Sequence, residues 1–219
     1  MSTTLRQRRK EARPQELLAA ALELFVEKGF AATRSEEIAA RAGVSKGTLY
    51  LYYPSKEDLL KAVISEQFLA HIAEGQQIIE AFTGTSGELL DNLIHEWWAR
   101  VGESPASGIC KLMMAEVRSF PELASYYAEQ VIEPSMDLMK RVIRRGIARQ
   151  EFREVDVDIC AHALVAPLVF LALHSQSFGA CCPEQRIDVR SFLAMQTDLV
   201  LRGLTHPGPA AEASPPSKP

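Results

Sequence analysis

The side chains best suited to chemistry lie together in the first quarter of the chain, in the segment SKGTLYLY. Lys46 can donate hydrogen bonds to a base, Gly47 allows close approach of the backbone, and Thr48 can contact a phosphate or a thymine methyl group. The hydroxyl groups of Tyr50 and Tyr52 can reach phosphates. On one exposed helix these residue types would suit the major groove of DNA better than they would suit catalysis.

Two short helices joined by a tight turn are predicted to present this surface. The first covers residues 36–42, with Ser35 as its N-cap. The second covers residues 46–52, with Ser45 as its N-cap. Gly43 between them permits the positive φ that a tight turn requires, so the pattern predicts a helix-turn-helix. The alternative is an ordinary pair of surface helices with no ligand.

A preceding helix is expected to support this pair. Apolar residues recur at helical spacing over residues 17–25, with Pro14 near the first turn and Gly29 at the end. The second and third helices should pack on one face of this helix. The residues expected to form the shared core are Leu22, Phe25, Ile38, Ala39 and Leu49.

The remainder of the chain is also predicted to be helical. Pro54 ends the third helix, and Ser55 caps a long fourth one. No segment alternates apolar and polar residues as a strand would, so the fold class is all-α, with about nine helices. The other helices are expected at about residues 86–101, 105–119, 121–149, 156–177 and 188–204.

Charge divides the chain into a basic head and an acidic remainder. Residues 1–62 carry 11 Lys and Arg against 8 Asp and Glu, whereas the rest carries 13 against 20. A polyanion should therefore meet only the head. The predicted divisions are a basic flexible arm (1–13), a helix-turn-helix domain (14–54), a helical ligand-binding and dimerisation domain (55–205) and a disordered tail (206–219).

Composition narrows the class of protein further. With 219 residues, of which 47% are hydrophobic, the chain can bury a real core. The longest apolar run, residues 159–173, is interrupted by His162 and Pro167 and is judged too short to cross a bilayer. The four cysteines lack metal-type spacing and no export signal is seen, so reduced thiols and a cytoplasmic location are expected. A redox role for Cys181 and Cys182 is left open.

The segment VSKGTLYLYYPSKEDLL resembles the DNA-binding signature of the tetracycline-repressor (TetR) family. The close match covers about residues 14–64, and Tyr53 replaces the usual phenylalanine. The positions that meet the family pattern are Gly43, Val44, Ser45, Gly47, Leu49, Tyr50, Tyr52, Ser55 and Lys56. This resemblance implies a homodimeric regulator with a three-helix DNA-binding head and a ligand-binding body.

The resemblance also assigns DNA contacts. It implies that Thr33 and Arg34 touch phosphates and that Lys56 does so at the start of the fourth helix. Glu36 departs from the common pattern and is expected to point aside, because a carboxylate repels phosphate. The remaining contacts are implied for Lys46, Gly47 and Thr48 at base edges and for Tyr50 and Tyr52 on the backbone, and Ser45 is included among the DNA-binding residues.

Dimerisation and ligand binding are likewise implied by the resemblance. Two heads would bind a palindromic operator in double-stranded DNA, and a small, largely apolar effector would release it. The interface candidates, which could instead be monomer core, are Leu164, Leu168, Val169, Leu171, Phe192, Met195 and Leu199. The pocket candidates, also open to a core role, are Trp97, Trp98, Met113, Met114, Phe120, Met136, Met139 and Phe170.

Three alternative functions remain at this stage. An activator would use the same DNA contacts as a repressor. A helical ligand-binding module without a DNA role is disfavoured by the Lys46–Tyr50 segment. An enzyme is disfavoured because no GxSxG, HExxH or phosphate-binding glycine loop is present. No cofactor, metal site or membrane partner is expected.

Overall fold

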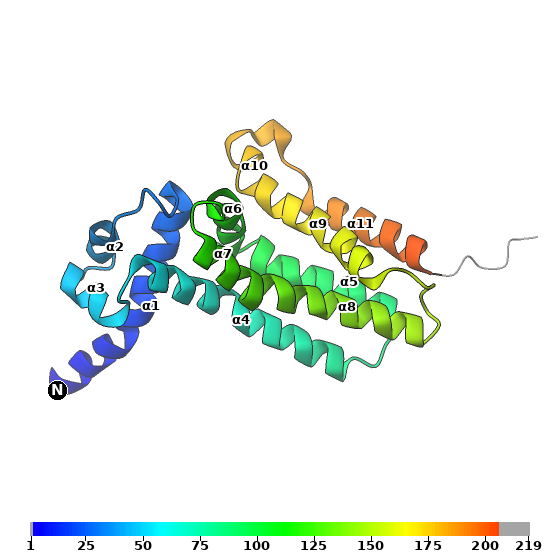
Figure 1. The fold of residues 1–219 in the computed structure, drawn as a ribbon, viewed down its shortest axis with the longest axis horizontal. Coiled ribbons are helices and arrows are strands. Elements are labelled where there is room, and N and C mark those ends of the chain that lie inside the picture. Colours follow the sequence, from blue (N-terminus) through cyan, green and yellow to red (C-terminus); the bar gives the residue numbers. More distant parts are fainter. Residues whose placement is uncertain (1, 206–219) are drawn as a thin grey trace, which may run out of the picture.

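The computed structural model describes the backbone of residues 2–205 and the side chains of residues 13–205. It is all-α over these residues, as predicted, with a small head beside a longer helical body (Figure 1). The helices are α1 (Ser2–Lys28), α2 (Ser35–Arg41), α3 (Lys46–Tyr52), α4 (Lys56–Ala81), α5 (Ser86–Trp97), α6 (Ala106–Glu116), α7 (Pro121–Tyr127), α8 (Glu133–Ala148), α9 (Val157–Ser175), α10 (Phe178–Cys181) and α11 (Val189–Leu204).

Short turns of other helix types join some of these elements. A π-helical turn, Trp98–Gly102, extends α5, and another, Ala128–Ile132, joins α7 to α8. A 3₁₀ turn, Pro183–Gln185, follows the single-turn α10. Within residues 2–205, counting α7 and α8 as one rod and leaving α10 aside gives the expected nine helices. The predicted tail, residues 206–219, lies outside the described residues.

The start of α1 differs from the prediction. A flexible arm was expected up to residue 13, with the helix opening at Pro14, but α1 begins at Ser2 and contains Pro14. Residues 5–12, LRQRRKEA, are mostly strong helix formers, which favours continuing the helix on the N-terminal side of the proline.

The three head helices enclose the predicted core. Phe25, Ile38 and Leu49 are fully buried, and Leu22 and Ala39 are nearly so. Gly43 has φ +65° and open space around its missing side chain, so its backbone conformation, and not crowding, is what favours glycine there. The predicted helix-turn-helix is confirmed.

The helix caps are local features, and most were predicted correctly. The hydroxyl oxygen of Ser45 accepts from the Thr48 N–H at 3.1 Å, and that of Ser55 accepts from the Asp58 N–H at 2.9 Å. The N-cap of α2 is Arg34, whereas Ser35 was predicted. Ser35 is instead buried as the first helical residue.

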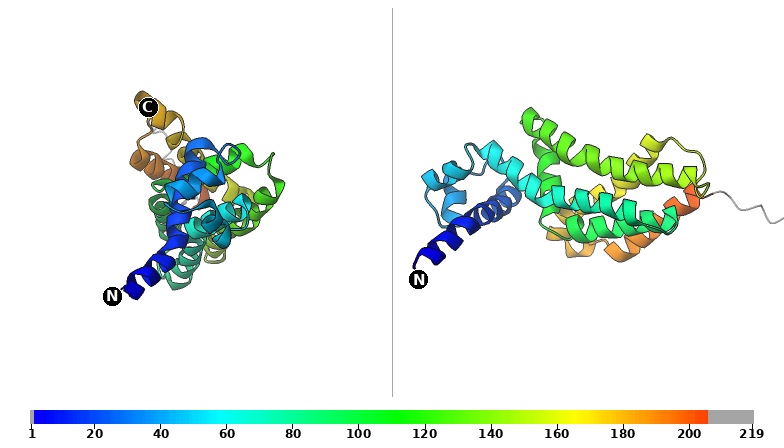
Figure 2. Two further views of the ribbon diagram at one scale, coloured as in Figure 1. Left: turned by 90° about the vertical axis from the view of Figure 1, so that its left-hand side faces the viewer. Right: turned by 90° about the horizontal axis from the view of Figure 1, so that it is seen from below.

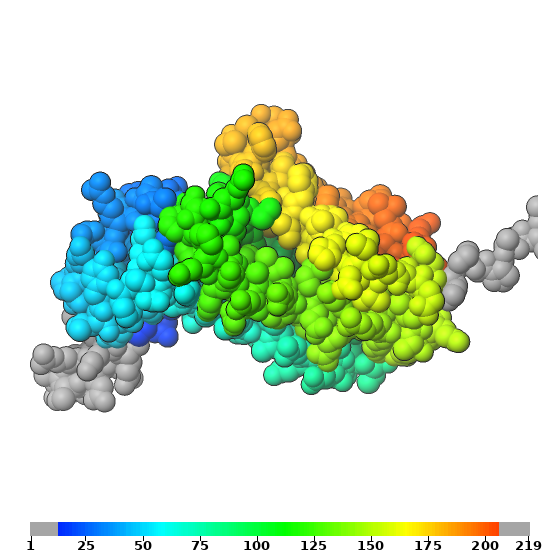
Figure 3. Space-filling model, viewed as in Figure 1, coloured from blue at the N-terminus to red at the C-terminus, as the bar shows by residue number. Residues whose placement is uncertain are grey.

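The head and body share a continuous hydrophobic core, because α4 runs from one into the other (Figure 2). Helix α6 packs against α1, where a Cβ on Gly108 would lie 2.6 Å from the side chain of Val26. The Glu116 carboxylate on α6 also accepts from the Ala31 N–H at 3.3 Å. A second core fills the far part of the body between α4, α5, α8, α9 and α11. The head therefore contacts α6 in addition to continuing into α4, and the space-filling view shows the α6–α7 region directly against it (Figure 3).

The apolar segment around α9 is longer than the sequence pattern predicted. By length and composition alone, Val157–Cys181 could cross a membrane, because α9 begins at Val157, before the apolar run 159–173, and is followed closely by α10. The inner side of α9 buries Leu164, Leu168 and Leu171 in the second core, as a core helix of a globular protein does.

Candidate nucleic-acid interface

Helix α3 presents the predicted reading surface to solvent. Leu49 anchors the helix in the head core, which turns Lys46, Gly47 and Tyr50 outward, while Thr48 is half-buried. Tyr52 is half-buried and packs against the head core. The structure thus places together the residues that were expected to face a major groove.

One exposed apolar residue on this helix was missed. The Leu51 side chain is 85% exposed. It follows Gly47 by one helical turn and therefore lies on the same side of α3. The signal was available in the predicted helix 46–52, because a leucine four residues after a groove-facing glycine cannot also point into the head core.

Glu36 faces the reading helix. Its Oε1 lies 2.5 Å from the Nζ of Lys46, so the carboxylate does not point aside as expected. The hydrogen bond from Lys46 holds the pKa of the Glu36 carboxyl below its ordinary value, and the same bond raises the pKa of Lys46. In the structure without DNA, the candidate base-reading lysine is therefore already paired.

Thr33 is not available to touch DNA with its side chain. It is 1% exposed, and its hydroxyl is within 2.7 Å of the Gly29 carbonyl oxygen and 3.1 Å of that of Leu24. The implied phosphate contact is therefore wrong for this side chain, because the hydroxyl fastens the connection between α1 and α2.

Lys56 has a similar internal role. Its Nζ is 2.7 Å from the Phe30 carbonyl oxygen, 3.0 Å from that of Thr33 and 3.4 Å from that of Ala31. An ammonium has three N–H donors, and these carbonyl groups can take all of them. In this structure the side chain bends back onto the α1–α2 connection, so the implied phosphate contact would require the ammonium to leave these carbonyl groups.

Other basic side chains of the described head differ in whether they form ion pairs. Lys28 pairs with Glu37 at 2.8 Å, and Arg41 pairs with Glu23 at 2.8 Å. Arg34 is exposed at the start of α2, and no ion pair to its side chain occurs among residues 13–205. Its predicted phosphate contact remains open.

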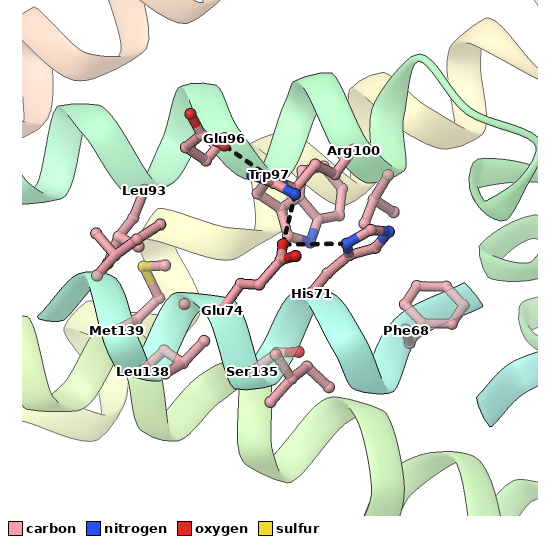
Figure 4. Close-up of a pocket in the computed structure, with 14 residues that line it drawn as sticks. Phe68, His71, Glu74, Leu93, Glu96, Trp97, Arg100, Ser135, Leu138 and Met139 are labelled. Atoms are coloured by element: carbon pink, nitrogen blue, oxygen red, sulfur yellow. Dashed lines mark hydrogen bonds and ion pairs between the residues drawn. The ribbon is translucent and has the colours of Figure 1, made fainter. Parts of the chain in front are cut away.

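The body contains a small cavity between α4, α5 and α8, of about 60 Å³ (Figure 4). Of the predicted pocket residues, only Trp97 and Met139 line it. The lining that sequence reasoning missed consists of Phe68, His71, Ile72, Glu74, Gly75, Ile78, Leu93, Glu96, Arg100, Val101, Ser135 and Leu138. Most of these are apolar residues at helical spacing, and nothing in the sequence distinguishes them from ordinary core.

An ion cluster lies along one side of this cavity. The Nε of Arg100 donates to Glu96 at 2.8 Å, and its Nη1 pairs with Glu74. His71 lies on the other side of Glu74, with 3.6 Å between its Nδ1 and a carboxylate oxygen (Figure 4). Carboxylates from α4 and α5 therefore converge on one guanidinium.

The other predicted pocket residues lie elsewhere. Trp98, Met113 and Met136 are buried in the two cores, although Trp98 also lines a separate surface groove. Phe120 packs edge-on against Phe30 at a centroid distance of 4.8 Å. Met114 and Phe170 are exposed. These residues do not line the cavity, because the faces of the helices on which they lie do not meet there.

The predicted interface residues separate into two groups. Leu164, Leu168 and Leu171 are buried in the monomer core, so they are not available to a partner. Val169 and Phe192 are half-buried. Met195 and Leu199 are 59% and 63% exposed on α11, and Ile159 and Phe170 are exposed on the neighbouring α9. An exposed apolar face therefore exists along α9 and α11, which lie side by side in the body (Figure 1).

Comparison with known proteins gives consistent matches for both parts of the chain. Residues 17–63 match the model of bacterial regulatory proteins of the tetR family. Residues 78–178 match the model of a tetracyclin repressor-like C-terminal domain. The HTH-type transcriptional regulator YdeS of Bacillus subtilis, itself uncharacterized, is 29% identical over 167 residues, which cover 75% of this chain and 80% of that protein.

Solved structures are similar in fold over most of their length. The transcriptional regulator FadR of Bacillus subtilis, in complex with stearoyl-CoA, has a TM-score of 0.72 at 22% identity and covers 86% of this chain and 98% of its own. A transcriptional regulator from Saccharomonospora viridis, in complex with choline, has a TM-score of 0.74 at 18% identity and covers 90% of this chain and 100% of its own. At these identities the likeness concerns the fold.

Proposed function

Because the chain belongs to the TetR family of helix-turn-helix transcriptional regulators, we propose that it is a homodimeric repressor that binds a palindromic operator and is released by a small effector. The observation that supports DNA reading best is the exposed surface of α3, with Lys46, Gly47 and Tyr50 around the buried anchor Leu49. Such a helix matches the width of the major groove.

In this proposal, dimerisation supplies most of the discrimination between the operator and other DNA sequences. One short helix reads few base pairs, whereas two heads fixed by a dimer read two half-sites one helical turn or a multiple apart. We place the interface on the exposed apolar faces of α9 and α11, around Phe170, Met195 and Leu199. A four-helix contact between two copies would remove this face from water.

We propose that the effector binds at the cavity between α4, α5 and α8. Its volume of about 60 Å³ is far below the roughly 300–1,000 Å³ of ordinary ligand pockets, so a ligand must push these helices apart. Phe68 and Gly75 in its wall lie on α4, the helix that continues into the head. Widening the cavity would therefore shift α4 and change the spacing of the two heads.

The chemistry of the effector is not named by the comparisons. The structural neighbours in complex with stearoyl-CoA and with choline differ greatly in size and charge. The mostly apolar lining of the cavity supports a small, largely apolar compound. Release by population shift needs differential binding of several kcal/mol between the two head spacings. A cytoplasmic location follows from the proposed role at DNA.

The test is selection of DNA from a pool of random duplexes, followed by titration of the selected site. We expect an inverted repeat with sub-micromolar affinity that falls steeply with salt. Failure to enrich any inverted repeat would contradict the proposal. Transcription in vitro from a promoter that carries the site distinguishes the alternative, because a repressor lowers the transcript yield and an activator raises it.

A further inference from the structure

The ion pair between Glu36 and Lys46 joins the two helices of the helix-turn-helix. Their side chains are 58% and 51% exposed, although Nζ and Oε1 are only 2.5 Å apart. An exposed pair of this kind contributes little to stability. Its position at the first turn of both α2 and α3 makes it a feature of the surface that would approach DNA.

The pair displays a donor and an acceptor side by side. The Lys46 ammonium has three N–H groups, of which Glu36 takes one and leaves two free. The Glu36 carboxylate has further lone-pair positions beyond the one used by Lys46. The Nζ of Lys46 also lies 5.7 Å from the centre of the Tyr50 ring, which limits its movement on the α3 side.

This arrangement is complementary to the major-groove edge of one G·C pair. Guanine presents the acceptors O6 and N7, and cytosine presents the N4–H donor next to them. O6 and N4 are hydrogen-bonded to each other and so are about 2.9 Å apart, close to the separation of Nζ and Oε1. An A·T pair also offers N6–H beside O4, but a lysine placed at O4 would meet the thymine methyl group in place of a second acceptor.

We propose that Glu36 and Lys46 read a single G·C pair in each half-site as a unit. Lys46 donates to O6 and N7 of guanine, and Glu36 accepts from N4–H of cytosine while keeping its bond to Lys46. Glu36 is then a specificity-determining residue, because its carboxylate is satisfied at this base pair and repelled by phosphates elsewhere. This inference rests on the proposed function and adds a base preference to it.

The test combines selected duplex DNA with two matched variants. Wild type is first used to select the operator. Each G·C pair of the half-site is then replaced by A·T in turn. Glu36→Ala removes the acceptor, and Glu23→Ala is the control, because Glu23 forms a comparable exposed pair with Arg41, 2.8 Å long, between α1 and the end of α2. Thermal melts confirm that both variants are folded.

The proposal expects the A·T replacement to weaken binding about tenfold for wild type and for Glu23→Ala. The same replacement should cost Glu36→Ala less than about twofold, and Glu36→Ala should bind non-operator DNA more tightly. Equal base preference in wild type and Glu36→Ala at every G·C pair of the half-site would overturn it. Failure to select any operator is a different result, which would remove the proposed function and this inference with it.

Discussion

The ammonium of Lys56 lies 4.4 Å from the centre of the Phe30 ring and donates a 2.7 Å hydrogen bond to the Phe30 carbonyl oxygen. Phe30 is fully buried and also packs edge-on against Phe120 at the junction with the body. The first residue of α4 therefore fastens the α1–α2 connection to the remainder of the head. A family-signature lysine thus has a structural role that does not require DNA.

Replacing this lysine should affect folding more than DNA electrostatics. In Lys56→Ala, three carbonyl groups lose a charged donor, and we expect the free energy of unfolding to fall by roughly 1–3 kcal/mol. Urea unfolding measures this change. Once binding is corrected for the folded fraction, the slope of log affinity against log salt should stay at the wild-type value. A slope smaller by about one would instead mean that Lys56 neutralises a phosphate. Lys61→Ala, elsewhere on α4, is the control.

Leu51 should matter for DNA binding and not for folding. Because its side chain is 85% exposed, Leu51→Ala should leave stability within about 0.5 kcal/mol of wild type. We expect operator affinity to fall several-fold, through loss of an apolar contact to a thymine methyl group. Leu49→Ala is the contrasting change, since Leu49 is fully buried and its loss should cost roughly 2–5 kcal/mol. Fluorescence anisotropy and thermal melts on both variants check this pair. Unchanged operator affinity in Leu51→Ala would remove the residue from the interface.

The acid sensitivity of the head should depend on Glu37. Its carboxylate accepts from Lys28 at 2.8 Å and from the Arg34 N–H at 3.1 Å, and the bond from Lys28 is the main reason that the Glu37 pKa is lowered. A carboxyl whose folded pKa is depressed stabilises the protein above its unfolded pKa. That contribution is lost as pH falls through about 4 and below. Glu37→Gln should therefore flatten the fall in melting temperature below pH 5. A slope identical to that of wild type would show that the pair contributes nothing.

The sequence predicted features that depend on neighbouring residues. Ser45 and Ser55 were identified as caps because the signal lies within three residues, and Gly43 because its turn is local. The internal hydrogen bonds of Thr33 and Lys56 were not predicted, because they depend on the path of the connection after α1. That path is set by the burial of Phe30, which no local pattern reveals.

In the body, the sequence likewise does not predict which helix faces pack against each other. Helix α9 is apolar nearly all round, so its sequence does not separate the inner residues Leu164 and Leu168 from the outer Phe170. Whether Trp97 or Trp98 borders a cavity depends on how α5 is rotated against α4 and α8. Sequence periodicity fixes which residues share a face, and the contacts between helices decide which neighbour that face meets.

The exposed residues on α11 provide the sharpest test of dimerisation. In the double variant Met195→Glu and Leu199→Glu, two carboxylates replace apolar side chains that are 59% and 63% exposed. The monomer should fold normally, because neither side chain is in its core. In a dimer the charges would be buried without partners, so we expect sedimentation to show dissociation and operator affinity to fall at least a hundredfold.

Ile132→Glu is the matched control for this experiment. Ile132 is 48% exposed on the π-helical turn Ala128–Ile132, which packs against α4, α7 and α8, so the charge change is comparable while the dimer should persist. Dissociation in the double variant alone would locate the interface on α11. If the double variant sediments as wild type does and binds the operator normally, the second copy must dock elsewhere, and the spacing of the two heads would have to be derived from another face.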